Sequence, residues 1–77
     1  MAKLSLMIIN MKIFAERFLE LRKEKKVSQA KAAKELDVSA SIVCYWETNR
    51  SEPTIVNLEK IAKYFGVSTD YLLGLED

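Results

Sequence analysis

The chain of 77 residues contains no histidine and a single cysteine, Cys44. Without histidine it lacks the most common general base and metal ligand of proteins. Cys44 has neither a histidine partner nor a second cysteine, which excludes a thiol protease, a zinc site and an internal disulfide. The sequence also lacks a phosphate-binding glycine loop and a dinucleotide-binding fingerprint. We therefore expect no enzyme activity, no metal, no cofactor and no small-molecule ligand.

No apolar run is long enough to cross a membrane. The stretch 4–9, LSLMII, is too short for a secretory signal and has no cleavage site. Repeats and low-complexity segments are absent as well. One unpaired cysteine suits a reducing compartment, so we expect a cytoplasmic protein without a membrane partner. An apolar content of 49% is enough for the core of one small domain.

Charge is nearly balanced overall, at +1, but it is unevenly distributed. Residues 22–34 contain six basic residues and one acid, a balance of +5, whereas residues 51–77 contain two basic residues and five acids, a balance of −3. A local basic cluster is the electrostatic feature by which proteins meet phosphate groups. A solvated helix surface would have the same composition, so the cluster needs a neighbouring motif to be informative.

That motif is the stretch 28–47, SQAKAAKELDVSASIVCYWE, which has the pattern of two short helices joined by a tight turn. In the second helix Ile42, Val43 and Trp46 fall on one face at about 100° per residue, so this face is expected to be buried. The opposite face holds small and polar residues: Ala40, Ser41, Cys44, Tyr45 and Thr48. Such a pair of helices forms a helix-turn-helix, which places its second helix in the major groove of DNA.

The whole pattern predicts an all-α fold with helices at about residues 12–25, 29–36, 40–48 and 55–65, and a short fifth helix that ends near residue 74. Asp37 and Asn49 stand where the chain needs a left-handed residue, and Gly66 closes the fourth helix. Four hydroxyl residues are placed to cap helix starts: Ser28, Ser39, Thr54 and Ser68. We expect a domain at 12–75, an arm at 1–11 and a tail at 76–77.

The chain resembles the XRE, or phage-repressor, family of helix-turn-helix domains, which includes the Cro and repressor types. The resemblance covers about residues 12–75. The matching residues lie in all five predicted helices: Phe14, Arg17, Phe18, Leu21, Arg22, Ser28, Gln29, Ala33, Leu36, Val38, Ser39, Val43, Trp46, Glu47, Pro53, Leu58, Ile61, Ala62, Phe65, Gly66, Val67, Ser68, Tyr71, Leu72, Leu73 and Gly74. It implies a compact five-helix DNA-binding domain that acts as a dimeric transcriptional repressor.

Within the family, Arg22 and Glu47 match a pair that links the first helix to the third, which implies a structural ion pair here. The chain departs from the family pattern at Asp37, where glycine is usual, and at Ala32, where leucine is usual. It also departs at Ala40 and Tyr45, where long polar or basic residues are common. These last two departures lie on the groove-facing side and leave the DNA sequence open.

Roles in DNA binding follow from side-chain chemistry. Ser41 and Tyr45 can hydrogen-bond a base edge, whereas Ala40 and Cys44 can only make apolar contacts, for example to a thymine methyl group. Residues at the start of the second helix and after the third are expected to contact phosphate: Gln29, Lys31, Thr48, Asn49 and Arg50. Because no Arg, Asn or Gln stands on the groove face, specificity is expected to depend on apolar contacts, water and DNA deformability.

Two questions stay open at the level of sequence. The same fold can serve as a protein-interaction module, such as an antitoxin or an anti-repressor partner, without binding DNA. Residues 1–11 can be a tag, a disordered arm or a strand at a dimer interface. For the expected homodimer, the candidate surfaces are Leu19, the 4–9 segment and residues 71–75, of which the resemblance favours the last.

Overall fold

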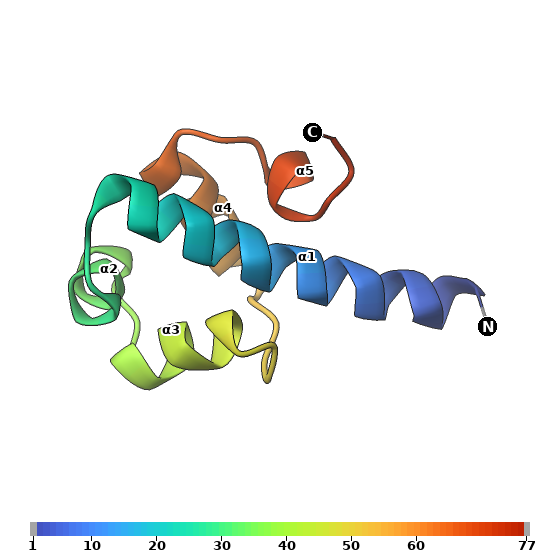
Figure 1. The fold of residues 1–77 in the computed structure, drawn as a ribbon, viewed down its shortest axis with the longest axis horizontal. Coiled ribbons are helices and arrows are strands. Elements are labelled where there is room, and N and C mark those ends of the chain that lie inside the picture. Colours follow the sequence, from blue (N-terminus) through green and yellow to red (C-terminus); the bar gives the residue numbers. More distant parts are fainter. Residues whose placement is uncertain (1, 77) are drawn as a thin grey trace.

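The computed structural model describes residues 2–76, which form five α-helices and no strand. The helices are α1 (Ala2–Lys25), α2 (Gln29–Leu36), α3 (Ala40–Glu47), α4 (Ile55–Phe65) and α5 (Thr69–Leu72). In Figure 1, α1 runs along the long axis, with α2 and α3 on one side of it and α4 and α5 on the other. The predicted all-α, five-helix fold is confirmed.

Four of the helices begin at the hydroxyl residues predicted to cap them. In each case the side-chain oxygen accepts a hydrogen bond from the backbone N–H three residues later, as Ser28 does from Lys31 and Ser39 from Ile42. Thr54 and Ser68 cap α4 and α5 in the same way. These bonds satisfy backbone donors that a helix start leaves without an intrahelical partner, and so they fix where each helix begins.

Residues in the left-handed backbone conformation, with positive φ, follow several of the helices. Asp37 (φ 59°) ends α2 and Gly66 (φ 68°) ends α4, and each donates its backbone N–H to carbonyl groups of the last turn. Asn49 (φ 61°) follows α3, as predicted. Lys26 (φ 61°) turns the chain after α1 in the same conformation, which the sequence did not predict because lysine adopts it rarely.

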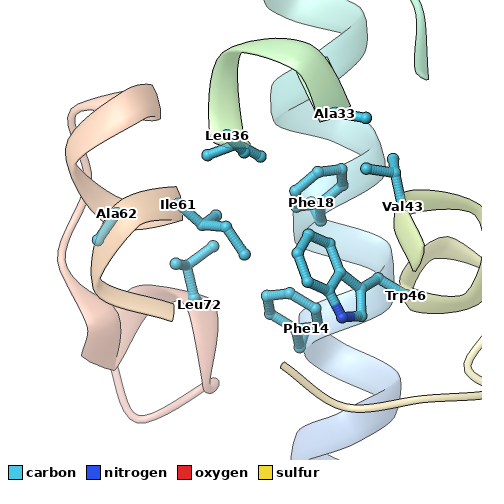
Figure 2. Packing of buried hydrophobic residues seen from close by; sticks show 9 residues of the cluster. All are labelled: Phe14, Phe18, Ala33, Leu36, Val43, Trp46, Ile61, Ala62 and Leu72. Carbon is cyan, nitrogen blue, oxygen red and sulfur yellow. The ribbon is translucent and has the colours of Figure 1, made fainter. Parts of the chain in front are cut away.

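The core lies where α1 crosses the other helices, and Figure 2 shows its members. The indole of Trp46 is 1% exposed and meets the rings of Phe14 and Phe18 edge to face, at centroid distances of 6.2 and 5.6 Å. Ile61 of α4 and Leu72 of α5 close the cluster from the other side. The aromatic layer thus ties α3 to α1, so the position of α3 depends on the core.

The first helix is longer than predicted, because it begins at Ala2 and not near residue 12. The segment 4–9, for which a strand at an interface was one prediction, lies within this helix. A short apolar run does not distinguish helix from strand. Once α1 is nucleated by the core, each added residue gains a hydrogen bond without a new nucleation cost, whereas a strand would need a partner strand.

Candidate nucleic-acid interface

The turn of residues 37–39 brings α2 and α3 together as a helix-turn-helix. Ala32 and Ala33, on the inner face of α2, are 0% and 2% exposed, and their small side chains let the neighbouring helices approach closely. The backbone N–H of Val38 donates to the carbonyl of Ala33 at 2.9 Å, which closes the turn onto the end of α2. The stretch 28–47 therefore has the predicted arrangement.

The outer face of α3 is open to solvent. Ala40 and Ser41 are exposed, and the ring of Tyr45 is the most exposed aromatic group on the helix, at 41%. Cys44 is half-buried, so it contributes less surface than the other three. On the opposite face Val43 and Trp46 are buried and Ile42 packs against the core. The predicted division of α3 into a buried and an exposed face is correct.

The residues after α3 are also exposed, but their hydrogen-bonding capacities differ. The Thr48 hydroxyl donates to the carbonyl of Cys44 at 2.8 Å, so its one proton is already used within the helix. A phosphate contact from that hydroxyl would require it to rotate away from this carbonyl. Asn49 and Arg50 are exposed, and a backbone bond from Arg50 N to the Tyr45 carbonyl, 2.8 Å long, sets the direction in which the chain leaves α3.

The start of α2 lies beside the same surface. Lys31 is exposed, and the first N–H groups of a helix lack intrahelical acceptors. The side chain of Gln29, in contrast, is half-buried, and its amide nitrogen donates to Glu47 Oε1 at 2.9 Å. The side-chain amide that was expected to meet phosphate therefore donates to α3 in this structure. The backbone N–H of Gln29 takes no part in that hydrogen bond.

Glu47 is the centre of a network that joins three segments. Its carboxylate accepts from Nε and Nη2 of Arg22, at 2.5 and 3.0 Å, as well as from Gln29. Arg22 also donates to the carbonyl of Val27 at 3.0 Å. The hydrogen bond to Glu47 raises the pKa of the Arg22 guanidinium above its usual value, against the opposing effect of burial. The implied pair between the first and third helices is thus present and also holds the start of α2.

Exposed basic side chains lie at the end of α1, in the turn after it and along α2. Lys23, Lys25, Lys26, Lys31 and Lys34 are all exposed. The ammonium group of Lys25 lies 4.8 Å from the ring centroid of Tyr64 of α4. The hydroxyl of Tyr64 donates to Glu35 of α2 at 2.7 Å, and burial, followed by this bond, raises the pKa of Tyr64 to about 12. The lysine side chains at the end of α1 and along α2 are therefore accessible from solvent. The ammonium group of Lys25 also lies against the ring of Tyr64.

Sequence reasoning missed a second anchoring arginine, Arg17. Its guanidinium lies 4.2 Å from the ring centroid of Tyr71 and donates to the backbone carbonyls of Tyr71 and Glu76, the latter at 2.7 Å. Ser68 donates to the Glu76 carboxylate. These contacts fold the C-terminal turn back onto α1. In the sequence, this contact was indicated only by the place of Arg17 and Tyr71 in the family pattern. The two residues are 54 positions apart, so no local pattern predicts that they meet.

Two other kinds of site are absent from the part of the chain that the structure describes. Within 2–76, no group of three or more His, Cys, Asp or Glu side chains is arranged to hold a metal ion. Over the same range, none of the helices combines the length and apolar content needed to cross a bilayer.

Comparison with known proteins points to one family. Residues 18–72 match the sequence profile of a helix-turn-helix family. The HTH-type transcriptional activator BcrR of Enterococcus faecalis is 34% identical over 64 residues, which cover 83% of this chain and 31% of BcrR. The uncharacterized HTH-type transcriptional regulator YobD of Bacillus subtilis is 29% identical over 65 residues, 84% of this chain and 58% of YobD. The chain thus spans only part of each relative. No solved structure matches it.

Proposed function

The chain belongs to the helix-turn-helix family, and from this premise we propose that it binds double-stranded DNA in a sequence-specific manner and regulates transcription. The observation that carries the proposal is the exposed outer face of α3, opposite a face that is buried in the core, in a domain whose α2 and the end of α1 carry exposed lysines. A helix presented in this way has the shape that the major groove accepts. We further propose that the protein acts in the cytoplasm and has no catalytic role.

Base reading is assigned to α3. Ser41 and Tyr45 supply hydroxyl groups for base edges, and Ala40 supplies an apolar contact of the kind that a thymine methyl group accepts. Cys44 has a smaller share because it is half-buried. With few polar groups on the face, sequence preference is expected to come in part from bound water and from the ease with which the DNA deforms.

Phosphate binding is assigned to both sides of α3. The backbone N–H of Gln29 and the side chain of Lys31 serve one strand, and Asn49 and Arg50 serve the other. Thr48 is a weaker candidate because its hydroxyl proton is bonded to Cys44. The network around Glu47 supports these roles, since it fixes α2 and α3 relative to α1 before DNA arrives.

The proposed binding unit is a homodimer on an inverted repeat. One recognition helix contacts only a few base pairs, which is too little to specify a site in a genome, and a second copy doubles the site. The two α3 helices are then expected to lie about 34 Å apart, one turn of DNA.

For the regulatory outcome we propose repression. Occupying a promoter requires only DNA binding, whereas activation needs a further contact with the transcription machinery. The similar protein BcrR is named as an activator, so the sign of regulation is part of the test and is measured with a reporter gene placed behind the selected site.

The decisive experiment selects preferred sites from randomised duplex DNA and measures binding at two salt concentrations. We expect enrichment of an inverted repeat and affinity that falls steeply with salt, because each neutralised phosphate releases about one counterion. Binding that does not depend on salt, or no binding at low salt, would contradict the proposal. The second outcome would favour a protein-interaction module, such as an antitoxin partner, which is the alternative for this fold.

A further inference from the structure

The first turn of α2 has two backbone N–H groups that are left for a ligand. The N–H of Lys31 donates to the Ser28 hydroxyl at 3.0 Å, and that of Ala32 donates to the Ser28 carbonyl at 3.0 Å. The N–H groups of Gln29 and Ala30 come first in the helix and therefore lack intrahelical acceptors. In the proposed function a DNA phosphate accepts from this end of α2, where the helix dipole favours negative charge. The position of the first turn therefore decides whether these donors meet the phosphate.

Two side-chain contacts fix that turn in place. Nη1 of Arg22 donates to the carbonyl of Val27 at 3.0 Å, just before the helix begins. Nε2 of Gln29 donates to Oε1 of Glu47 at 2.9 Å, and the same oxygen accepts from Nη2 of Arg22 at 3.0 Å. Gln29 is thus the residue that supplies the first N–H of α2 and also ties α2 to the last residue of α3.

The side chain of Gln29 is itself poorly placed to bind phosphate. It is half-buried, and its amide nitrogen faces Glu47 because the amide oxygen, which has no proton to donate, would be repelled by the carboxylate there. A phosphate at the same nitrogen would lie close to the Glu47 carboxylate, and like charges at such a distance repel. Lys31, in contrast, is exposed and carries a positive charge of its own. This arrangement favours an indirect role for the Gln29 amide.

We propose that Gln29 is a positioning residue, whose side chain acts through Glu47 to hold the start of α2 at a fixed place relative to α3. The phosphate donors of α2 and the base-reading face of α3 then fit the same stretch of DNA at once. The inference rests on the proposed function and assigns the Gln29 amide a role other than that of a phosphate ligand. Because the hydrogen bond to Glu47 already restricts the side chain, binding to DNA does not have to order it.

A double-mutant cycle separates action through Glu47 from direct contact with DNA. Gln29→Met keeps the length of the side chain and removes its hydrogen bond, whereas Glu47→Ala removes the acceptor. Affinity for the selected duplex site is measured for the parent, both single variants and the double variant, at a temperature at which thermal unfolding shows each protein to be folded. Lys31→Met is the comparator, because it removes a proposed phosphate contact that does not depend on the hydrogen bond to Glu47. If Glu47→Ala does not fold, Glu47→Gln replaces it, since a neutral acceptor binds the amide more weakly than a carboxylate does.

We expect Gln29→Met to lower the affinity of the parent about fivefold, which corresponds to one net hydrogen bond, and to have no further effect once Glu47→Ala is present. Lys31→Met should lower affinity by the same factor with and without Glu47→Ala. In the presence of Glu47→Gln, the loss caused by Gln29→Met should be smaller than in the parent. An equal loss in both backgrounds would show that Gln29 contacts DNA directly and would overturn the proposal, as would no loss in the parent.

A second measurement distinguishes positioning from a general loss of stability. One phosphate of the selected site at a time is replaced by a neutral methylphosphonate, and affinity is measured again. In the parent, replacing the phosphate that faces the start of α2 should weaken binding. Gln29→Met should reduce that penalty and leave the penalty at the phosphate bound by Arg50 unchanged, whereas equal changes at all positions would overturn the proposal. A parent that binds no DNA would instead contradict the proposed function.

Discussion

The carboxylate of Glu47 accepts two hydrogen bonds from the guanidinium of Arg22 and so ties the end of α3 to α1. The two side chains are 4% and 14% exposed, respectively, and the pair is therefore shielded from water. Since α3 has only eight residues, a fixed point at its last residue sets the angle at which its outer face is presented. The same carboxylate also accepts from Gln29, so the orientations of α2 and α3 depend on one group.

Removing that carboxylate should be costly. Glu47→Ala leaves Arg22 and Gln29 without their acceptor, and we expect the free energy of unfolding to fall by about 1.5–3 kcal/mol. Urea unfolding followed by circular dichroism measures the change, with Glu16→Ala at an exposed position of α1 as the control. If the combined Arg22→Met and Glu47→Ala variant loses the sum of the two single losses, the pair contributes no coupling energy and this account of it is wrong.

Glycine at residue 26 should stabilise the domain. Lys26 follows α1 with φ of 61°, a conformation that costs a residue with a Cβ about 1 kcal/mol or more and that glycine adopts freely. Asparagine tolerates this region better than lysine. We therefore expect Lys26→Gly to raise the melting temperature more than Asn49→Gly does (φ 61°). Equal or reversed effects in calorimetry would show that backbone strain at Lys26 is not limiting.

Trp46 should be the most sensitive position in the core. Its indole packs edge to face against the rings of both Phe14 and Phe18 and is 1% exposed. Trp46→Ala is expected to cost about 3–5 kcal/mol, a large share of the stability of so small a domain. Tyr45→Ala changes the neighbouring exposed residue and serves as the control in chemical unfolding. A Trp46→Ala variant that melts like the parent would contradict the packing in Figure 2.

Stability should fall at alkaline pH through Tyr64. Its pKa is about 12 in the folded protein, above the ordinary value of 10, so the fold favours the protonated phenol. This contribution is complete below pH 10 and is lost as the pH rises from 10 toward 12. Tyr64→Phe should therefore lose less stability than the parent between pH 9 and pH 11. Identical losses in urea unfolding at the two pH values would exclude a coupling of Tyr64 ionisation to folding.

Local features of the fold could be predicted from the sequence because they depend on neighbouring residues. Ser28 and Ser39 cap helices through bonds that span three residues, and the two faces of α3 follow from helical spacing alone. The contacts of Gln29 with Glu47 and of Arg17 with the C-terminal turn join residues 18 to 59 positions apart, and no local pattern encodes them. The helical arm was missed because a short apolar run fits a helix and a strand equally well.

The candidate site could be predicted in outline but not in detail. Helical spacing located the exposed face of α3, yet it could not show that Cys44 is half-buried or that the Thr48 hydroxyl is bonded to a carbonyl. These details depend on how the chain leaves α3, which is decided by the left-handed turn at Asn49 and by the backbone bond of Arg50. The strongest candidates for DNA contact are therefore Ser41, Tyr45 and Arg50.

The two kinds of DNA contact should respond differently to substitution. Ser41→Ala removes a base-edge contact, so it should relax the preference at one base pair by roughly 1 kcal/mol or more and leave other positions unchanged. Tyr45→Ala should weaken binding to the preferred site. Arg50→Ala removes a phosphate contact, so it should weaken binding to all sequences alike and reduce the slope of log affinity against log salt by about 1.

Competition titrations with single-base variants of the selected site measure both effects, with Lys63→Ala on α4 as a charge-matched control. If Ser41→Ala and Tyr45→Ala leave preference and affinity unchanged in folded protein, the outer face of α3 does not read DNA, whatever the effect of Arg50→Ala.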